Sequence, residues 1–154
     1  MHQYLFKITL DKKVYLVQTD TTVGFLSQNH QALSLLKERS VEKPFVTVCS
    51  SFKTLKTLSR IPSKDKNRVR RSKKSTFVYP NNKAIRVVKD TKHTQFLNRF
   101  GWMYSTSANE KSAPYNKEFA FEKSDIIVED IDGFYEGEPS AIYKLTKSKR
   151  QRLR

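Results

Sequence analysis

The chain has 154 residues and a mass of 18.0 kDa, which suffices for one domain with a buried core and leaves no room for a second independent domain. Thirty lysines and arginines stand against 15 aspartates and glutamates, and the net charge of +15 favours an anionic partner. No apolar run approaches the roughly 20 residues of a membrane-spanning helix, and residues 1–10 lack the apolar centre of a secretory signal. We therefore expect a single domain over residues 1–154 in a soluble, cytoplasmic protein without a membrane partner.

The positive charge is concentrated in two segments. Residues 60–74 have no apolar periodicity and predict a flexible basic loop, and residues 144–154 predict a basic C-terminal tail. Both segments could bind a phosphate backbone with a salt-sensitive affinity. The RNA-binding candidates are Arg68, Arg70, Arg71, Lys73 and Lys74. The alternative is a solvated loop and tail that only keep the protein soluble.

In the first half of the chain, strands and short helices are predicted in turn. Residues 4–10 and 14–18 are rich in β-branched and aromatic side chains, and a short polar connection between them predicts a hairpin or neighbouring strands. A one-sided apolar pattern predicts a helix over residues 30–37, with Asn29 as its N-cap. Residues 45–49 predict a central strand, after which a serine-capped helix runs until Pro62 ends it.

The second half predicts more strands than helices. Residues 76–79 and 84–88 predict two strands joined by a turn, and residues 91–100 predict a helix that Gly101 ends. Beyond them we expect a short helix over residues 117–122 and strands over residues 125–128 and 141–145, with the acidic loop 129–138 between the strands. The alternation predicts an α/β or α+β fold: a single twisted open sheet of mixed direction with flanking short helices.

Residues 105–109, Ser-Thr-Ser-Ala-Asn, directly follow the apolar run Trp-Met-Tyr of a buried strand. Small hydroxyl and amide side chains at a strand end let backbone N–H groups approach a phosphate or carboxylate. These residue types also gather in ordinary loops that bind nothing. Two further segments strengthen the ligand-site interpretation. They are residues 19–24, Thr-Asp-Thr-Thr-Val-Gly, and residues 37–44, where Lys-Glu-Arg precedes Lys-Pro.

Taken in this order, the three segments resemble the YrdC-like family of threonylcarbamoyl-adenylate synthases. The resemblance extends from about residue 14 to the final arginines and implies a twisted open sheet. It also implies an activity, the condensation of L-threonine, bicarbonate and ATP into threonylcarbamoyl-adenylate and pyrophosphate for tRNA threonylcarbamoyladenosine modification. Residues 72–74, Ser-Lys-Lys, depart from the Pro-Gly-Pro turn that is usual in the family.

The resemblance also implies which residues form the site, and none of them is a nucleophile. Threonine and bicarbonate are expected at Thr19, Thr21, Arg39, Thr76, Ser105 and Ser140, and the nucleotide at Lys37, Lys43, Arg86, Ser107, Asn109 and Arg154. An arginine fork can hold a carboxylate or a phosphate at two points. The alternative for the Lys-x-Arg pair is an interaction with the dipole of the preceding helix. For the other positions, ordinary structural hydroxyls and surface arginines are the alternative.

The residues exclude several other chemistries. The chain has no Gly-x-x-x-x-Gly-Lys-Ser/Thr loop, and its three histidines have no ligand-spaced partners, so we expect neither a P-loop nor a metal site. ATP is expected as a substrate with Mg²⁺ on its phosphates, and no tightly bound cofactor is expected. The lone Cys49 is expected to be a buried thiol. The competing function is a noncatalytic protein on the same fold that binds double-stranded RNA or tRNA through the two basic segments.

Overall fold

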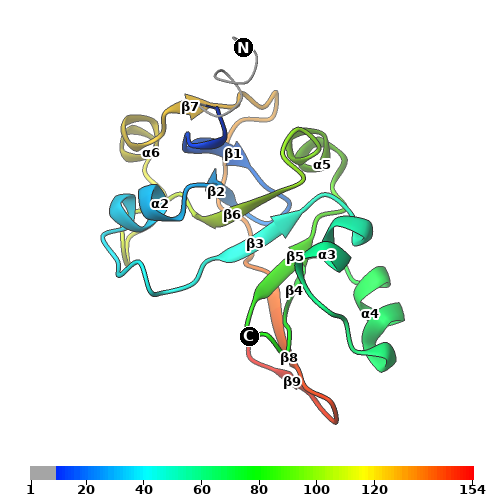
Figure 1. Ribbon diagram of the computed structural model, residues 1–154. Helices are drawn as coiled ribbons and strands as arrows, with labels where there is room; N and C mark the ends of the chain where they lie inside the picture. The colour runs from blue at the N-terminus through cyan, green and yellow to red at the C-terminus, as the bar shows by residue number, and fades with distance from the viewer. Residues whose placement is uncertain (1–9) are drawn as a thin grey trace, which may run out of the picture.

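The computed structural model describes residues 10–154. They form one mixed sheet with strands in the order β7-β1-β2-β6-β3-β5-β4-β8-β9, running from β7 at the top of Figure 1 to β9 at the bottom. The strands are β1 (Tyr15–Gln18), β2 (Val23–Ser27), β3 (Val46–Cys49), β4 (Ser75–Val78), β5 (Ala84–Val87), β6 (Trp102–Ser107), β7 (Ile126–Ile127), β8 (Ala141–Leu145) and β9 (Arg150–Arg152). The predicted single mixed sheet is confirmed. The strand predicted over residues 4–10 lies outside the described residues, apart from its last residue.

Short helices flank this sheet. They are α2 (His30–Leu36), α3 (Phe52–Leu58), the 3-10 turn η1 (Ser63–Asp65), α4 (Lys66–Arg71), α5 (Thr91–Leu97) and α6 (Lys117–Lys123). Asn29 caps α2 and Ser51 caps α3, because each side chain accepts a hydrogen bond from the backbone N–H three residues later. Both caps agree with the sequence prediction. None of the helices between residues 10 and 154 is long and apolar enough to cross a bilayer.

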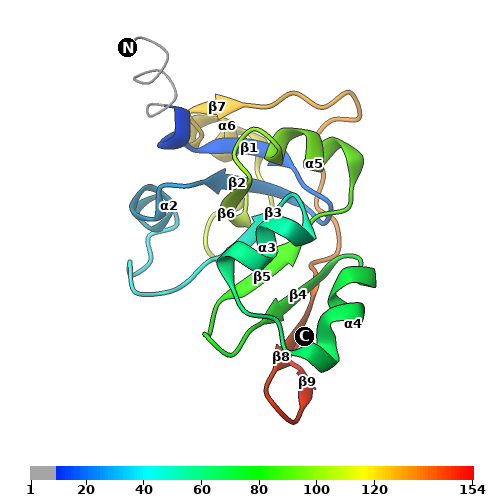
Figure 2. The ribbon, with the colours of Figure 1, turned by 45° about the vertical axis from the view of Figure 1, so that its right-hand side comes forward.

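The two faces of the sheet bury different helices. Val48 pairs with Met103 and Arg86, so these three side chains share one face, which α5 covers through the buried Leu97. The alternate residues face the other way. There α2 and α6 pack over the β1 and β2 end of the sheet, and α3 and α4 pack over the β4 and β5 end. Figure 2 shows α3 and α4 together in front of β5 and β4.

The predicted flexible loop over residues 60–74 is wrong. This segment contains η1 and the two-turn helix α4, which is anchored by Val69 with 3% of its surface exposed. Val69 packs in the apolar cluster that also holds Leu55 and Phe77. Because the helix is so short, only one apolar side chain faces inward, and one residue produces no periodicity in the sequence. The predicted basic tail is also more ordered than expected, since β9 pairs antiparallel with β8.

The Ser-Thr-Ser segment, which we predicted to follow a strand, is instead part of that strand. Residues 105–107 belong to β6, where Ser105 pairs with both Leu26 and Val46, and Ser107 pairs with Gly24. Hydroxyl side chains therefore continue a central strand instead of following it. The ladders on both sides supply backbone hydrogen bonds, which allows polar residues to keep a strand conformation.

Candidate active site

A cavity of about 280 Å³ opens on the face of the sheet that carries Arg86 and α5. Its walls come from the turn between β1 and β2, the segment before β3, the strands β5 and β6, the residues just before β8, and Arg154 after β9. Three lining residues are arginines (Arg39, Arg86 and Arg154) and none is acidic. The other lining residues with polar side chains are threonines and serines. A concave site with three guanidinium groups and several hydroxyls is suited to a ligand with more than one anionic group.

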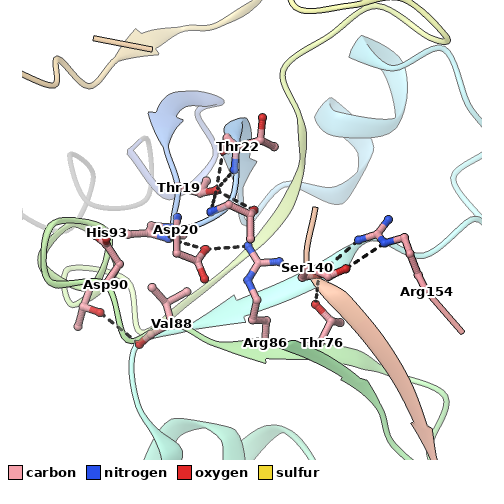
Figure 3. A network of polar contacts seen from close by, with 12 residues as sticks. Thr19, Asp20, Thr22, Thr76, Arg86, Val88, Asp90, His93, Ser140 and Arg154 are labelled. Carbon is pink, nitrogen blue, oxygen red and sulfur yellow. Dashed lines mark hydrogen bonds and ion pairs between the residues drawn. The ribbon is translucent and has the colours of Figure 1, made fainter. Parts of the chain in front are cut away.

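Arg86 is held from behind by a buried carboxylate (Figure 3). Its Nη2 lies 3.0 Å from Oδ1 of Asp20, and the two side chains are only 6% and 4% exposed. Burial raises the pKa of Asp20, but the contact with His93 and the charge of Arg86 outweigh burial and bring that pKa below its ordinary value. The carboxylate is therefore ionised, and it fixes one end of the guanidinium.

Arg154 is held by Ser140, whose hydroxyl in turn contacts Thr76 (Figure 3). Its Nε donates to the carbonyl oxygen of Ser140 at 2.9 Å and its Nη2 to the Ser140 hydroxyl at 3.3 Å. The Ser140 hydroxyl in turn lies 2.7 Å from that of the fully buried Thr76. Burial and the charge of Arg86 lower the pKa of Arg154. The last residue is thus bound to the start of β8 beside the cavity.

The turn between β1 and β2 is organised by Thr19. Its Oγ1 accepts hydrogen bonds from the backbone N–H groups of Thr21 and Thr22, at 3.2 and 3.1 Å. Gly24 follows, and a Cβ there would lie 3.0 Å from the carbonyl oxygen of Thr106. The glycine therefore allows β2 and β6 to approach closely at the cavity wall.

Lys37 and Arg39 leave the end of α2 in different directions. Nζ of Lys37 donates to the carbonyl oxygens of Ser107 and Asn109, at 3.0 and 2.7 Å, and to Oδ1 of Asn109 at 3.2 Å. Burial, together with the nearby charge of Arg39, lowers the pKa of Lys37 to about 8. Arg39 donates from Nη2 to the carbonyl oxygen of Pro44 and lies 4.4 Å from the centre of the Phe45 ring. Its buried Nε has no partner among the described residues.

Comparison with known proteins decides the family. The sequence profile named Sua5_yciO_yrdC, described as telomere recombination, matches residues 7–154. The chain belongs to the Sua5/YciO/YrdC family. A curated relative from Mycoplasma genitalium, the uncharacterized protein MG259, is 29% identical over 104 residues, which are 66% of this chain and 22% of MG259.

Solved structures with this fold include two of Sua5 from P. abyssi. One is a double variant (TM-score 0.80, 17% identity, 100% of this chain and 57% of that chain). The other is complexed with L-threonine (TM-score 0.78, 19% identity, 99% and 54%). Full-length HypF in a phosphate- and nucleotide-bound form also shares the fold (TM-score 0.73, 13% identity, 99% and 28%). The chain thus spans little more than half of Sua5 and about a fifth of MG259.

This Sua5/YciO/YrdC chain brings most of its predicted site residues to one place. Eight of them line the cavity: Thr19, Thr21, Arg39, Arg86, Ser105, Ser107, Ser140 and Arg154. Asn109 lines an adjoining cavity of about 190 Å³, which shares Thr22, Ser107 and Pro139 with the first. Lys37 binds the wall between them, and Thr76 lies behind Ser140. Lys43 is exposed and lies outside both linings.

Sequence reasoning missed Asp20 and His93. Asp20 stands inside the recognised Thr-Asp-Thr motif, and the motif was the one signal that could have drawn attention to it. His93 is 73 residues away on α5, and a lone histidine in a helix gives no sign of its partner. Only the packing of α5 against this face of the sheet brings the two together.

The predicted acidic loop over residues 129–138 is docked on the sheet in part. We call residues 129–140, between β7 and β8, the strap. The Tyr135 N–H donates to Oε1 of Gln18 at 2.9 Å, and the Tyr135 carbonyl accepts from the Val23 N–H at 3.1 Å. The Glu136 carboxylate accepts from the Tyr115 N–H. The strap thus crosses the turn between β1 and β2, and its last residues, Pro139 and Ser140, line the cavity. Among residues 10–154, no three His, Cys, Asp or Glu side chains are grouped as metal ligands.

Proposed function

We propose that this protein is a threonylcarbamoyl-adenylate synthase. The observation that carries the proposal is the single cavity with three arginines, a hydroxyl-rich lining and no acidic residue. The substrates include a carboxylate and a triphosphate, and both need cationic partners. The Sua5 relative complexed with L-threonine and the phosphate- and nucleotide-bound HypF, which share the fold, support the same ligand classes.

The reaction requires the protein to hold each attacking group close to the atom that it attacks. The threonine amine attacks bicarbonate and water leaves, and a carbamate oxygen then attacks the α-phosphorus of ATP and pyrophosphate leaves. We assign the threonine carboxylate to Arg39, with hydroxyl contacts from Thr19, Thr21 and Ser105. Bringing these groups together is the main contribution of the protein, because no covalent intermediate is needed.

We assign the phosphates to Arg86 and Arg154, with Ser107 and Ser140 beside them. Positive charge at the α- and β-phosphates stabilises the charge that develops as pyrophosphate leaves. Lys37 contributes by fixing the backbone of residues 107–109, since its three donors are already bound there. Mg²⁺ would arrive on the ATP phosphates and supply further charge neutralisation.

The proposal is tested by pyrophosphate release. Purified protein should release pyrophosphate only when ATP, L-threonine and bicarbonate are all present, and Arg39→Ala should lower the rate by about a hundredfold or more. Arg99→Ala, which removes an exposed arginine outside the cavity lining, should retain the wild-type rate. Release that does not depend on threonine would contradict the proposed function.

A second function, RNA binding, is favoured because the basic segment over residues 60–74 contains the helix α4. On α4 the side chains of Arg68, Arg70 and Arg71 are exposed while Val69 is buried, so the helix presents its cations to solvent in a fixed arrangement. Lys73 and Lys74 continue this surface before β4. We propose that it binds the phosphate backbone of tRNA or double-stranded RNA, either alone or in addition to catalysis.

A further inference from the structure

The contacts of Asp20 with Arg86 and His93 join three elements that are distant in sequence (Figure 3). Asp20 lies in the turn after β1, Arg86 lies on β5 and His93 lies on α5. Nδ1 of His93 is 3.3 Å from the backbone nitrogen of Asp20 and 3.4 Å from its Oδ1. With Nδ1 unprotonated the ring accepts from the amide, and with Nδ1 protonated it donates to the carboxylate. Either way, a histidine side chain with no exposed surface holds Asp20.

A buried ion pair is an expensive way to stabilise a fold. Taking both charges out of water costs several kcal/mol per ion, and well-packed apolar residues of the same size often replace such a pair without loss of stability. Stability alone therefore gives a weak reason for Asp20 and Arg86 at this place. Arg86 also lines the cavity, and its buried Nε has no partner among residues 10–154. Nη2 of the Arg86 guanidinium is thus fixed by Asp20, while its Nε–H group has no hydrogen-bond acceptor among residues 10–154.

We propose that Asp20, held by His93, is a positioning residue that fixes the Arg86 guanidinium at the cavity wall and offsets its charge. A phosphate group at Arg86 then binds a guanidinium of fixed orientation. Because Asp20 offsets the positive charge, the phosphate is bound weakly enough to dissociate. The inference rests on the proposed function for the identity of the anion. It assigns no contact between Asp20 and the ligand, because Asp20 is absent from the cavity lining.

The test is a double-mutant cycle read out as the Kd of inorganic pyrophosphate, measured by isothermal titration calorimetry. Asp20→Asn keeps an oxygen acceptor for Arg86 but removes the negative charge, and it should tighten binding by roughly fivefold. In the Arg86→Gln background the same change should alter the Kd by less than about twofold. Without Arg86, Asp20 has no guanidinium to orient or to offset, so removing its charge has no route to the bound anion.

Asp132→Asn is the matched control, and His93→Gln is a second variant that tests the role of Asp20. Asp132→Asn makes the same charge change at the exposed ion pair with Lys92 and should leave the Kd unchanged. His93→Gln releases Asp20 but keeps its charge, so Arg86 loses its fixed orientation and pyrophosphate binding should weaken by about twofold to threefold. If Asp20→Asn fails to fold, His93→Gln carries the test. An unchanged Kd in the folded variants, or equal tightening by Asp132→Asn, would overturn the proposal.

Threonine-dependent pyrophosphate release is measured on the same samples, so that two failures can be told apart. A shifted Kd without turnover would contradict the synthase function and leave the role of Asp20 intact. Turnover with an unshifted Kd would contradict the role of Asp20 alone. A wild-type protein that binds no pyrophosphate would overturn the inference.

Discussion

Lys37 shows how strongly the surroundings of one residue decide its chemistry. Its ammonium group is half-buried, binds three oxygen atoms of residues 107–109 and lies near the charge of Arg39. Burial and this like charge lower its pKa to about 8, against an ordinary value of 10.5. The burial of the ammonium group and its three oxygen contacts distinguish Lys37 from a lysine that only faces the end of a helix.

The lowered pKa gives a prediction for the pH dependence of stability. Between about pH 8 and 10.5 the folded state binds fewer protons at Lys37 than the unfolded state, so the free energy of unfolding should rise with pH in this window. Lys37→Arg stays charged and should lack this rise. The wild type should therefore gain up to about 1 kcal/mol relative to Lys37→Arg between about pH 7 and pH 9.5, after allowing for solvent screening.

Urea unfolding at the two pH values measures this difference. Lys53→Arg, at an exposed position on α3, is the control and should not differ from the wild type in its pH dependence. A parallel response of Lys37→Arg and wild type would show that Lys37 is as solvated as its neighbours.

Among the elements, the strap over residues 129–140 depends on one glycine. A Cβ at Gly137 would lie 1.9 Å from the carbonyl oxygen of Thr21, which is too close for any side chain. The strap and the turn that holds Thr19 and Asp20 are therefore in direct backbone contact. An element without helix or strand structure thus helps to place the cavity wall.

Gly137→Ala should accordingly destabilise the protein by about 1–3 kcal/mol, because the methyl group forces the strap away from Thr21. It should also weaken pyrophosphate binding, since the strap ends in the lining residues Pro139 and Ser140. Thermal unfolding and calorimetry measure the two effects. Glu138→Ala, at the exposed next position, should change neither. Wild-type stability of Gly137→Ala would mean that the strap is not docked as described.

At the scale of the whole molecule, the net charge of +15 is distributed unevenly over the fold. The cavity holds three arginines, and a second group of cations lies on α4 and the residues before β4. In the first group Arg86 is buried, Arg39 is half-buried and Arg154 is exposed beside Ser140, whereas the cations of the second group are all exposed. Enclosed cations suit a small anionic ligand, and exposed cations on a helix suit an extended phosphate backbone.

RNA affinity should therefore fall steeply with salt, and the logarithmic slope should drop by about one for each phosphate that a variant no longer neutralises. Replacing Arg68, Arg70 and Arg71 together by glutamine should reduce both the affinity and the slope in a tRNA titration. Replacing the exposed Lys111, Lys117 and Lys123 by glutamine makes the same charge change elsewhere and should have a much smaller effect. Salt-independent binding, or an equal weakening in the two triple variants, would exclude α4 as the RNA surface.

The sequence alone determined the features that depend on local pattern. The apolar runs predicted β3, β5 and β8, and the capping residues Asn29 and Ser51 marked the starts of α2 and α3. Eight of the fifteen residues that line the cavity had also been named, but these were implied by the family resemblance and not by local pattern. The strands and helix caps depend only on neighbouring residues, whereas the site residues depended on a resemblance across the chain.

Tertiary structure alone decided the rest. The order of α4 depends on a single residue, Val69, meeting the apolar cluster around Phe77, and the contact of Asp20 with His93 spans 73 residues. The same packing determines which arginines face the cavity and which face solvent. A contact between distant residues exists only after the intervening chain has folded, and the free energy of burying a charge depends on what surrounds it there.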